Sequence, residues 1–378
     1  MNGSPAAWPR LRRVATWTGL AVFVALIAEL FLRIYAPVPM LPRYVSSAEY
    51  GVRMNTANQT YAHTTPDYRI VIRTNSKGIR SDVEIPYEKP RGKKRIVALG
   101  DSFLMGYGAH PEEMLLNVMI ERLRAAGHDV ELVNLAVSGF GNAEELVALE
   151  AEGMKYEPDL VLIGWHDTDL SDNVRSGLYQ LKEGKLERAA DTFLPAVKTR
   201  EFLFKIPLYR FLAGNSQLYN WFRDKAGGAV KDALADFRDA KIEAAAKETG
   251  PDPAVARADA GAPVGAADER SHAELLMLSI LQRIEQVSRD GGAELAIIDI
   301  PVRLGRERFR SAFPVGPGFD DLAVFAPLPL FQARAGELLY WERSHSHFTP
   351  LGNRIVGEGA ADLILERQLL GGPTRGSP

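Results

Sequence analysis

Short apolar runs alternate with amphipathic stretches from Lys94 onward, and this alternation limits the fold more than any other feature of the chain. A chain that alternates strands and helices in this way forms a parallel sheet whose crossover helices cover both faces. The run Asp159–Gly164 is almost entirely apolar, as expected for a strand covered on both sides. The predicted strands are Arg95–Leu99, Val130–Val137, Asp159–Gly164, Glu294–Ile300 and a short fifth strand at Leu338–Trp341.

Capping residues and prolines mark where the predicted helices begin. Pro111 opens a predicted helix at 111–126, and Asn142 is predicted to cap a helix that runs through Glu144 to Met154. Later helix starts are predicted from the capping box of Ser271 and Glu274 and from Thr349 followed by Pro350. The helices and strands together predict an α/β fold, a three-layer sandwich with a parallel sheet.

The first predicted strand ends in the sequence R-I-V-A-L-G-D-S-F, which places Ser102 directly after a sharp turn. Parallel sheets bind ligands at the carboxyl ends of their strands. Serine becomes a nucleophile when a base removes its proton. Among the seven histidines, His347 is the best-placed base, because it lies just before the last helix. Taken alone, Ser102 is typical of a turn or cap residue, and His347 of a surface loop.

The N-terminal region predicts a membrane anchor. Three arginines precede an apolar run at about 14–36, and about 20 apolar residues suffice to span a bilayer. Glu29 and Arg33 interrupt the run, and their spacing allows them to pair on one helix face. The basic cluster predicts that residues 1–13 are cytoplasmic. A cleaved signal peptide and a buried helix of a soluble protein are the alternatives.

The chain is predicted to contain one α/β domain with an N-terminal extension and an insertion. With 378 residues the chain is long enough for about two domains, but the strand and helix order resumes after a polar, Ala- and Gly-rich stretch. We therefore predict a linker and extension at 37–93, the α/β domain at 94–370 with an insertion at about 174–270, and a disordered tail at 371–378. The net charge of −3 gives no indication of nucleic-acid binding, and the absence of cysteine excludes disulfides and thiolate chemistry.

Four short motifs in chain order resemble a known family. They are G-D-S-F at Gly100–Phe103, N-L-A-V-S-G-F-G-N at Asn134–Asn142, the stretch Pro158–Asn173, and S-H-F-T-P-L-G-N at Ser346–Asn353. Together they resemble the conserved blocks of the SGNH (GDSL) hydrolase superfamily, in particular its membrane-anchored bacterial members. N-S-K-G-I-R at Asn75–Arg80 resembles the segment that precedes the first block. The resemblance implies a flavodoxin-like sandwich and a serine esterase or acyltransferase.

The resemblance also implies roles for single residues. Ser102 would be the nucleophile and His347 the general base, while Gly100 and Asp101 would hold the turn. The oxyanion hole would use the backbone N–H groups of Ser102 and Gly139.

Two positions depart from the family pattern. The oxyanion asparagine of the family is replaced by Thr168 or by His166, depending on the register of the loop. The acid that usually orients the histidine would fall on Ser344 or His345, and Glu342 is near but in another register. These departures leave two interpretations open. Either Ser102 and His347 form an active dyad whose histidine is oriented by another group, or the site is degenerate and non-catalytic.

The expected reaction is acyl-ester chemistry on O-acetyl groups of an envelope or exported polysaccharide, outside the cytoplasmic membrane. A lipid esterase at the membrane surface and a non-catalytic binding or assembly protein are the alternatives. We expect no cofactor, no metal and no nucleic-acid partner, and the sequence does not determine the oligomeric state. Asp167, Asp169 and Asp172 are more typical of a solvated or capping loop than of a cation site. The aromatic residues of Phe202–Phe222 are expected to pack the insertion against the core rather than to contact sugars or lipid.

Overall fold

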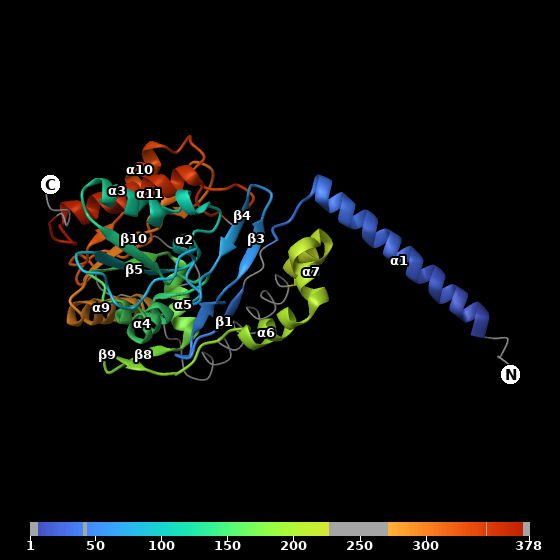
Figure 1. Ribbon diagram of the computed structural model, residues 1–378, viewed down its shortest axis with the longest axis horizontal. Coiled ribbons are helices and arrows are strands. Elements are labelled where there is room, and N and C mark those ends of the chain that lie inside the picture. Colours follow the sequence, from blue (N-terminus) through green and yellow to red (C-terminus); the bar gives the residue numbers. More distant parts are fainter. Residues whose placement is uncertain (1–6, 41–43, 227–270, 345, 373–378) are drawn as a thin grey trace. The chain divides into compact units, whose positions relative to one another are not determined.

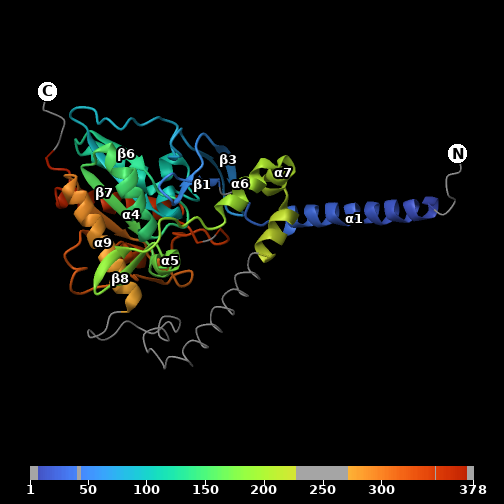
Figure 2. The same ribbon diagram turned by 90° about the horizontal axis from the view of Figure 1, so that it is seen from below.

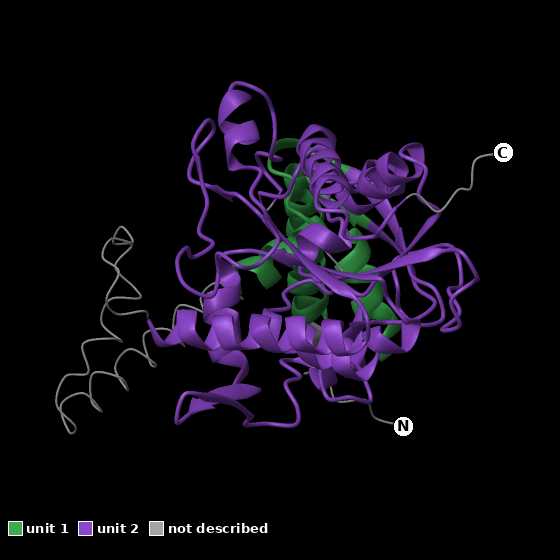
Figure 3. Ribbon diagram, turned by 90° about the vertical axis from the view of Figure 1, so that its left-hand side faces the viewer, with its two compact units in different colours: residues 1–42, 63–68, 203–251 green, residues 43–62, 69–202, 252–378 purple. Residues whose placement is uncertain are grey.

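A computed structural model describes residues 7–40, 44–226, 271–344 and 346–372. The expected disordered tail lies mostly outside these residues, as does the Ala- and Gly-rich part of the insertion. The chain divides into two compact units, shown in different colours in Figure 3. The larger unit contains residues 43–62, 69–202 and 252–378, and the smaller contains 1–42, 63–68 and 203–251.

The larger unit is built on a five-stranded sheet in which every neighbouring pair is parallel. Its order is β13-β10-β7-β5-β6, which in chain order is the 2-1-3-4-5 arrangement of flavodoxin-like folds. The predicted fold class is therefore confirmed. The strands are β5 (Lys94–Gly100), β6 (Val130–Asn134), β7 (Leu160–Trp165), β10 (Glu294–Asp299) and β13 (Val324–Phe325).

The prediction of a fifth strand at Leu338–Trp341 was wrong. The fifth strand of the sheet is β13, and Tyr340 makes only an isolated bridge to Phe348. Leu339 and Tyr340 are nevertheless buried, which explains their strand-like apolar pattern.

Helices cover both faces of the sheet and complete the three layers seen in Figure 1. The helices α3 (Leu115–Ala125) and α11 (Pro350–Glu366) pack against each other, and α4 (Asn142–Ala151), α5 (Thr168–Ser176) and α9 (His272–Asp290) form a second group. The second group buries a core with the middle strands in which Leu146, Ile163 and Ile280 are fully buried. Shorter elements are α2 (Ser102–Met105), η1 (Pro111–Glu113), η2 (Gly153–Tyr156) and α10 (Leu328–Ala333).

Two predicted caps are confirmed and two predicted helices need correction. The side chain of Ser271 accepts from the Glu274 N–H at 3.3 Å, and that of Thr349 accepts from Gly352 at 3.3 Å. The predicted helix 111–126 is broken because Met114 is extended, with ψ at 136°. Asn142 is the first helical residue, not the cap, and its side chain points to buried carboxyl groups instead.

The segment expected to be a linker supplies core residues. It contains β1 (Val45–Ser47) and β2 (Arg53–Asn55), an antiparallel pair, and then β3 (Thr60–Thr64) and β4 (Arg69–Arg73). Val52, Ile79 and Ile85 are buried in the same apolar cluster as the strands of the sheet. The remaining strands are short: β8 (Tyr179–Lys182), β9 (Lys185–Arg188), β11 (Val302–Arg303) and β12 (Phe309–Arg310).

The smaller unit contains the long helix α1 (Ala7–Tyr35) and the helix α7 (Pro207–Asn215). The helix α6 (Val197–Lys205) leads into it, and residues 217–226 are helical as well. Within α1, the stretch Arg12–Tyr35 is long and apolar enough to cross a membrane. Within this unit, large apolar side chains of α1 and α7 are exposed, among them Phe23, Leu26, Leu208 and Phe211.

Candidate active site

Ser102 stands at the point where the central strand β5 turns into α2. The preceding residue, Asp101, is the N-cap of this helix, and its Oδ1 accepts the Phe103 N–H at 2.8 Å. Asp101 is buried, whereas Ser102 is half-buried. The turn therefore presents the serine hydroxyl at the carboxyl end of β5, next to the point where the strand order of the sheet reverses.

Two glycines make room for α2 at the end of the sheet. Gly100 on β5 lies opposite Gly164 on β7 in the parallel register. A Cβ at Gly100 would lie 3.0 Å from Leu104 atoms, and a Cβ at Gly164 would overlap the Leu104 side chain. Because neither glycine has a side chain, Leu104 can pack directly against the strands and fix the helix that carries Ser102.

His347 approaches Ser102 from the other end of the chain. The bridge between Tyr340 and Phe348 closes the turn that precedes α11, and the Trp341 N–H donates to the His347 carbonyl at 2.8 Å. The His347 side chain is largely buried, and its Nε2 lies 2.8 Å from Ser102 Oγ. The structure thus places the expected nucleophile and the expected base within hydrogen-bond distance, although 245 residues separate them in the chain.

The candidates for orienting His347 have different surroundings. Ser344 is fully buried. Glu342 is half exposed, and its Oε1 lies 3.4 Å from Arg306 Nε. His345 lies outside the described residues.

Phe103 packs between two imidazole rings. Its ring centre lies 5.0 Å from that of His347 and 5.2 Å from that of His166, which is stacked at 30°. Tyr107 covers His347 from another side, with a ring separation of 5.5 Å. These contacts hold both histidines beside α2, the helix that begins with Ser102.

The sheet register distinguishes His166 from Thr168. Gly100 and Gly164 are paired, and Ser102 and His166 each follow this pair by two residues. Thr168 is the first residue of α5, and its Oγ1 lies 3.1 Å from His166 Nδ1. By this register His166 is the residue that corresponds to Ser102, whereas Thr168 contacts the His166 ring.

The loop of Gly139 is held by a residue that the sequence did not single out. Gly139 has φ at +81°, a left-handed conformation that glycine adopts most readily. Arg53 Nη2 donates to the Gly139 carbonyl oxygen at 2.5 Å and to Glu144 Oε1 at 2.8 Å. The loop is also tied to the strand end, because the Val137 N–H donates to the Gly100 carbonyl at 3.0 Å.

Both members of this ion pair are buried, with side-chain exposures of 7% for Arg53 and 1% for Glu144. Burial raises the pKa of Glu144 to about 7, although Arg53 acts in the opposite direction. Arg53 comes from β2, in the segment expected to be a linker, and Asn55 of the same strand donates to the Ala136 carbonyl at 3.0 Å. No pattern in the sequence indicated this contact, because its partners lie 91 residues apart.

A group of buried carboxyl groups lies among the elements that meet at the site. Asn142 Nδ2 donates to Glu145 Oε2 at 2.9 Å and approaches Asp169 Oδ2 at 3.4 Å. The same Asp169 oxygen accepts the His166 N–H at 3.0 Å. Burial is the main cause that raises the pKa of Glu145, Asp169 and Asp101, and the charges of neighbouring carboxyl groups raise the pKa of Glu145 and Asp169 further.

The expectation of a solvated or capping loop at Asp167–Asp172 is met only in part, because Asp169 accepts the His166 N–H just before α5 but is not solvated. Asp169 and Asp172 are buried. Asp167 remains partly exposed, and its Oδ2 lies 3.1 Å from Arg310 Nη2. Among the described residues, no group of three His, Asp or Glu side chains is arranged to hold a metal ion.

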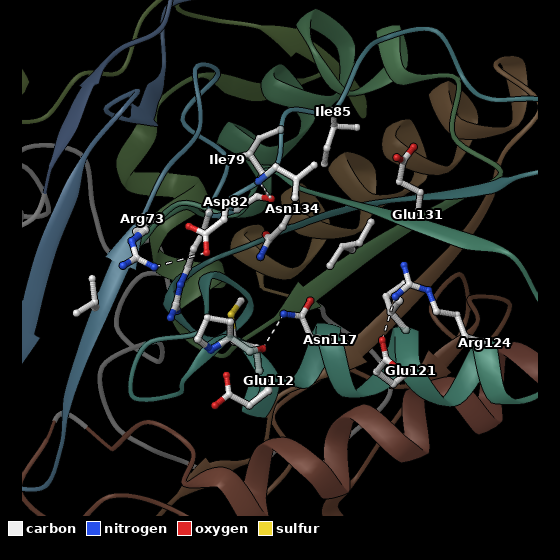
Figure 4. A pocket seen from close by; sticks show the side chains of 18 residues that line it. Arg73, Ile79, Asp82, Ile85, Glu112, Asn117, Glu121, Arg124, Glu131 and Asn134 are labelled. Carbon is white, nitrogen blue, oxygen red and sulfur yellow. Dashed lines mark hydrogen bonds and ion pairs between the residues drawn. The ribbon is translucent and has the colours of Figure 1, made fainter.

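A cavity of about 600 Å³ lies away from Ser102, beside the edge strand β6 and the helix α3 (Figure 4). Charged side chains that line it are paired with one another: Arg73 with Asp82 at 3.6 Å, and Arg124 with Glu121 at 2.9 Å. Neither Ser102 nor His347 lines this cavity.

Comparisons with known proteins were made by sequence and by structure. No family model matches the sequence, and no curated protein matches it either. Among solved structures, the psychrotrophic esterase EstA from Pseudoalteromonas sp. matches with 16% identity and a TM-score of 0.36, over 73% of this chain and 99% of its own.

Two further solved structures match over similar shares of the two chains. The acetyl xylan esterase AlAXEase matches with 11% identity and a TM-score of 0.35, over 72% of this chain and 98% of its own. A GDSL-like lipase from Parabacteroides merdae matches with 10% identity and a TM-score of 0.32, over 73% of this chain and 97% of its own.

Proposed function

We propose that the protein is a serine ester hydrolase or O-acyltransferase that acts through an acyl-enzyme on Ser102. The observation that carries this proposal is the 2.8 Å distance between Ser102 Oγ and His347 Nε2 at the carboxyl edge of a parallel sheet. A serine and a histidine in this contact form the minimal unit for nucleophilic acyl transfer.

The proposed reaction has two halves. His347 Nε2 takes the proton of Ser102 Oγ while the oxygen attacks the ester carbonyl carbon. The oxyanion accepts hydrogen bonds from the backbone N–H groups of Ser102 and Gly139 and from the His166 side chain. Collapse breaks the ester C–O bond, and His347 returns the proton to the leaving alcohol. Water or a sugar hydroxyl then attacks the acyl-enzyme and loses its proton to His347. The bond between Ser102 Oγ and the acyl carbon breaks, His347 returns the proton to Ser102 Oγ, and the acid or the new ester leaves.

The proposed substrates are O-acetyl groups on an envelope or exported polysaccharide. Support comes from the resemblance of the sequence motifs to anchored SGNH hydrolases and from α1, which is long and apolar enough to cross a membrane. We place residues 1–13 in the cytoplasm and the larger unit outside the inner membrane, because Arg12 and Arg13 precede the apolar stretch. No cofactor takes part in this reaction.

A fluorophosphonate probe tests the nucleophile. We expect the full-length protein to be labelled, and the Ser102→Ala and His347→Ala variants to remain unlabelled while their circular dichroism is unchanged. A folded wild-type protein that does not react would overturn the proposal in favour of a binding or assembly role.

A second assay tests the substrate class. We expect wild-type protein that has not been treated with the probe to release acetate from an O-acetylated polysaccharide, or to transfer it to a second glycan. Release of fatty acid from phospholipid vesicles, with no acetate released from the glycan, would instead assign the protein as a lipid esterase.

A further inference from the structure

Glu29, the acidic residue inside the apolar stretch of α1, is part of the fold of the smaller unit. Its Oε2 accepts from the Leu218 N–H at 2.8 Å and from Ser216 Oγ at 2.9 Å, and its Oε1 accepts from the Gln217 N–H at 2.9 Å. Arg33 Nε donates to the same carboxylate at 2.7 Å. Glu29 thus binds the first N–H groups of the helical residues 217–226, where a negative charge is most favourable.

These contacts fix the depth of residues 216–218 relative to α1. Glu29 lies 17 residues beyond Arg12, which is about 25 Å along a helix. If Arg12 lies at one membrane surface, Glu29 falls just inside the far boundary of a hydrocarbon core of about 30 Å. Residues 216–218 must therefore reach the lipid boundary, because they donate the hydrogen bonds that Glu29 accepts.

The side chains around this point suit a lipid environment. On α7, Leu208 and Phe211 are 64% and 62% exposed, and they are three residues apart on one helix face. In the next helical stretch, Phe222 is 58% exposed and Trp221 is 36% exposed. An expected packing role against the core is wrong for these residues. Tyr209 and Tyr219 point toward each other instead, with ring centres 5.8 Å apart.

We propose that residues 207–226 form an interfacial hairpin, which lies beside the end of α1 in the outer leaflet and inserts Leu208, Phe211 and Phe222 among the lipid chains. Figures 1 and 2 both show α7 beside the last turns of α1. The proposal also requires that α1 is retained, because cleavage after it would remove Glu29 from the helix that it caps. This inference rests on the proposed membrane span and not on the proposed catalytic activity.

The charged residues of the interfacial hairpin fit anionic lipid. Arg210, Arg223 and Lys225 are basic, and Asp224 is the one acid in residues 207–226. Long basic side chains near a lipid boundary extend their charges to the headgroups while their stems stay in the apolar region. Aromatic residues such as Trp221 are typical of the same boundary.

The absence of cysteine makes this proposal directly testable with single-cysteine variants. Leu208→Cys, Phe211→Cys and Phe222→Cys are labelled with an environment-sensitive fluorophore in the full-length protein. The proteins are reconstituted into phosphatidylethanolamine–phosphatidylglycerol vesicles that contain lipids with spin-label quenchers on the acyl chains. We expect the quenchers to reduce the fluorescence of all three labels by at least half.

Two control positions report water exposure. Lys182→Cys lies in β8 and Lys185→Cys lies in β9, and both positions are exposed and outside the hairpin. Labels at these positions are expected to be quenched by aqueous iodide and little by the acyl-chain quenchers. If the three hairpin labels behave like the controls, or are shielded from both quenchers as in a protein–protein contact, the proposal is overturned. An intact mass of the membrane-extracted protein verifies that α1 is retained, and its loss would also overturn the proposal.

Discussion

In the proposed reaction, His166 takes the place of the asparagine that the family motif would supply to the oxyanion. Its ring stacks on Phe103, directly after Ser102. We expect His166→Ala to lower kcat for a p-nitrophenyl ester by about 10²–10³, the usual effect of losing one oxyanion donor. Thr168→Val is expected to change kcat less than tenfold, since Thr168 acts only through its contact with His166 Nδ1.

His166→Asn restores an amide donor at this position and serves as the matched control. Its kcat is expected to stay within about tenfold of wild type. A larger loss in Thr168→Val than in His166→Ala would assign the oxyanion contact to Thr168 instead.

Arg53 donates to the Gly139 carbonyl, and if Gly139 contributes to the proposed oxyanion hole, Arg53 is expected to be a positioning residue. Arg53→Met is expected to lower kcat with little change in KM, because the Gly139 peptide loses its anchor but the binding surface keeps its side chains. The same substitution leaves Glu144 buried without its partner, which typically costs about 3–5 kcal/mol of unfolding free energy. Steady-state kinetics and urea unfolding in detergent measure the two effects.

The double variant Arg53→Met, Glu144→Leu separates these effects. Removing both charges is expected to recover most of the stability, since no unpaired ion remains buried. The loss in kcat is expected to persist, because the Gly139 carbonyl still lacks its donor. Recovery of kcat together with stability would indicate a purely structural role for Arg53.

The proximity of Ser102 and His347 could be predicted from the sequence, because the order of the strands and of the motifs indicates that both residues lie at the same edge of the sheet. It did not separate His166 from Thr168, since the choice depends on the register between β5 and β7. It missed Arg53 and Glu144 entirely. A buried ion pair between segments far apart in the chain leaves no periodic pattern, and charged residues ordinarily indicate an exposed surface.

The small helix α2 depends on the two glycines beneath it. Gly164→Ala is expected to cost about 1–3 kcal/mol, because the new methyl overlaps Leu104 and pushes α2 away from the strands. Leu104→Ala alone is expected to cost about 2–5 kcal/mol by leaving a cavity. In the double variant the methyl occupies part of this cavity, so the combined cost is expected to fall below the sum of the two. Urea unfolding of the four proteins measures this coupling, and strictly additive costs would contradict it.

Elements with strong periodicity were predicted well, and elements fixed by tertiary contacts were not. The four long strands and the helices α9 and α11 follow from apolar patterns and side-chain caps that lie within the element itself. The break at Met114 has no such local signal, because Pro111 is equally suited to start a 3₁₀ turn or a long helix. β13 has two residues, too few for a detectable alternation.

The buried carboxyl groups make the stability of the protein depend on pH. Burial raises the pKa of Glu144 to about 7 from 4.5, and Glu145 and Asp169 are raised as well. A group with a raised pKa binds its proton more tightly in the folded state, so its stabilising effect is complete at low pH and is lost as the pH rises. We therefore expect the free energy of unfolding to fall between about pH 4.5 and 8, by about 1.4 kcal/mol per pH unit for each proton that is released on unfolding.

Glu145→Gln is the variant that tests this pH dependence. The amide keeps an oxygen for the Asn142 donor but does not titrate. Urea unfolding from pH 5 to pH 9 is expected to show a shallower decline in this variant than in wild type. A wild-type protein whose stability rises over this range would show that the carboxyl groups are ionised in the folded state.

The contact between Glu29 and the helix that begins near Ser216 also has a consequence for the timing of biosynthesis. Glu29 leaves the ribosome 187 residues before Ser216, an interval of about 10–40 s at 5–20 residues per second. In an anchored protein, α1 thus enters the membrane long before its final partner exists. Arg33 is made only four residues after Glu29 and is the partner at hand during that interval. The ion pair inside the anchor then compensates the charge of Glu29 from the start, and the finished protein keeps this pair and adds the donors of residues 216–218.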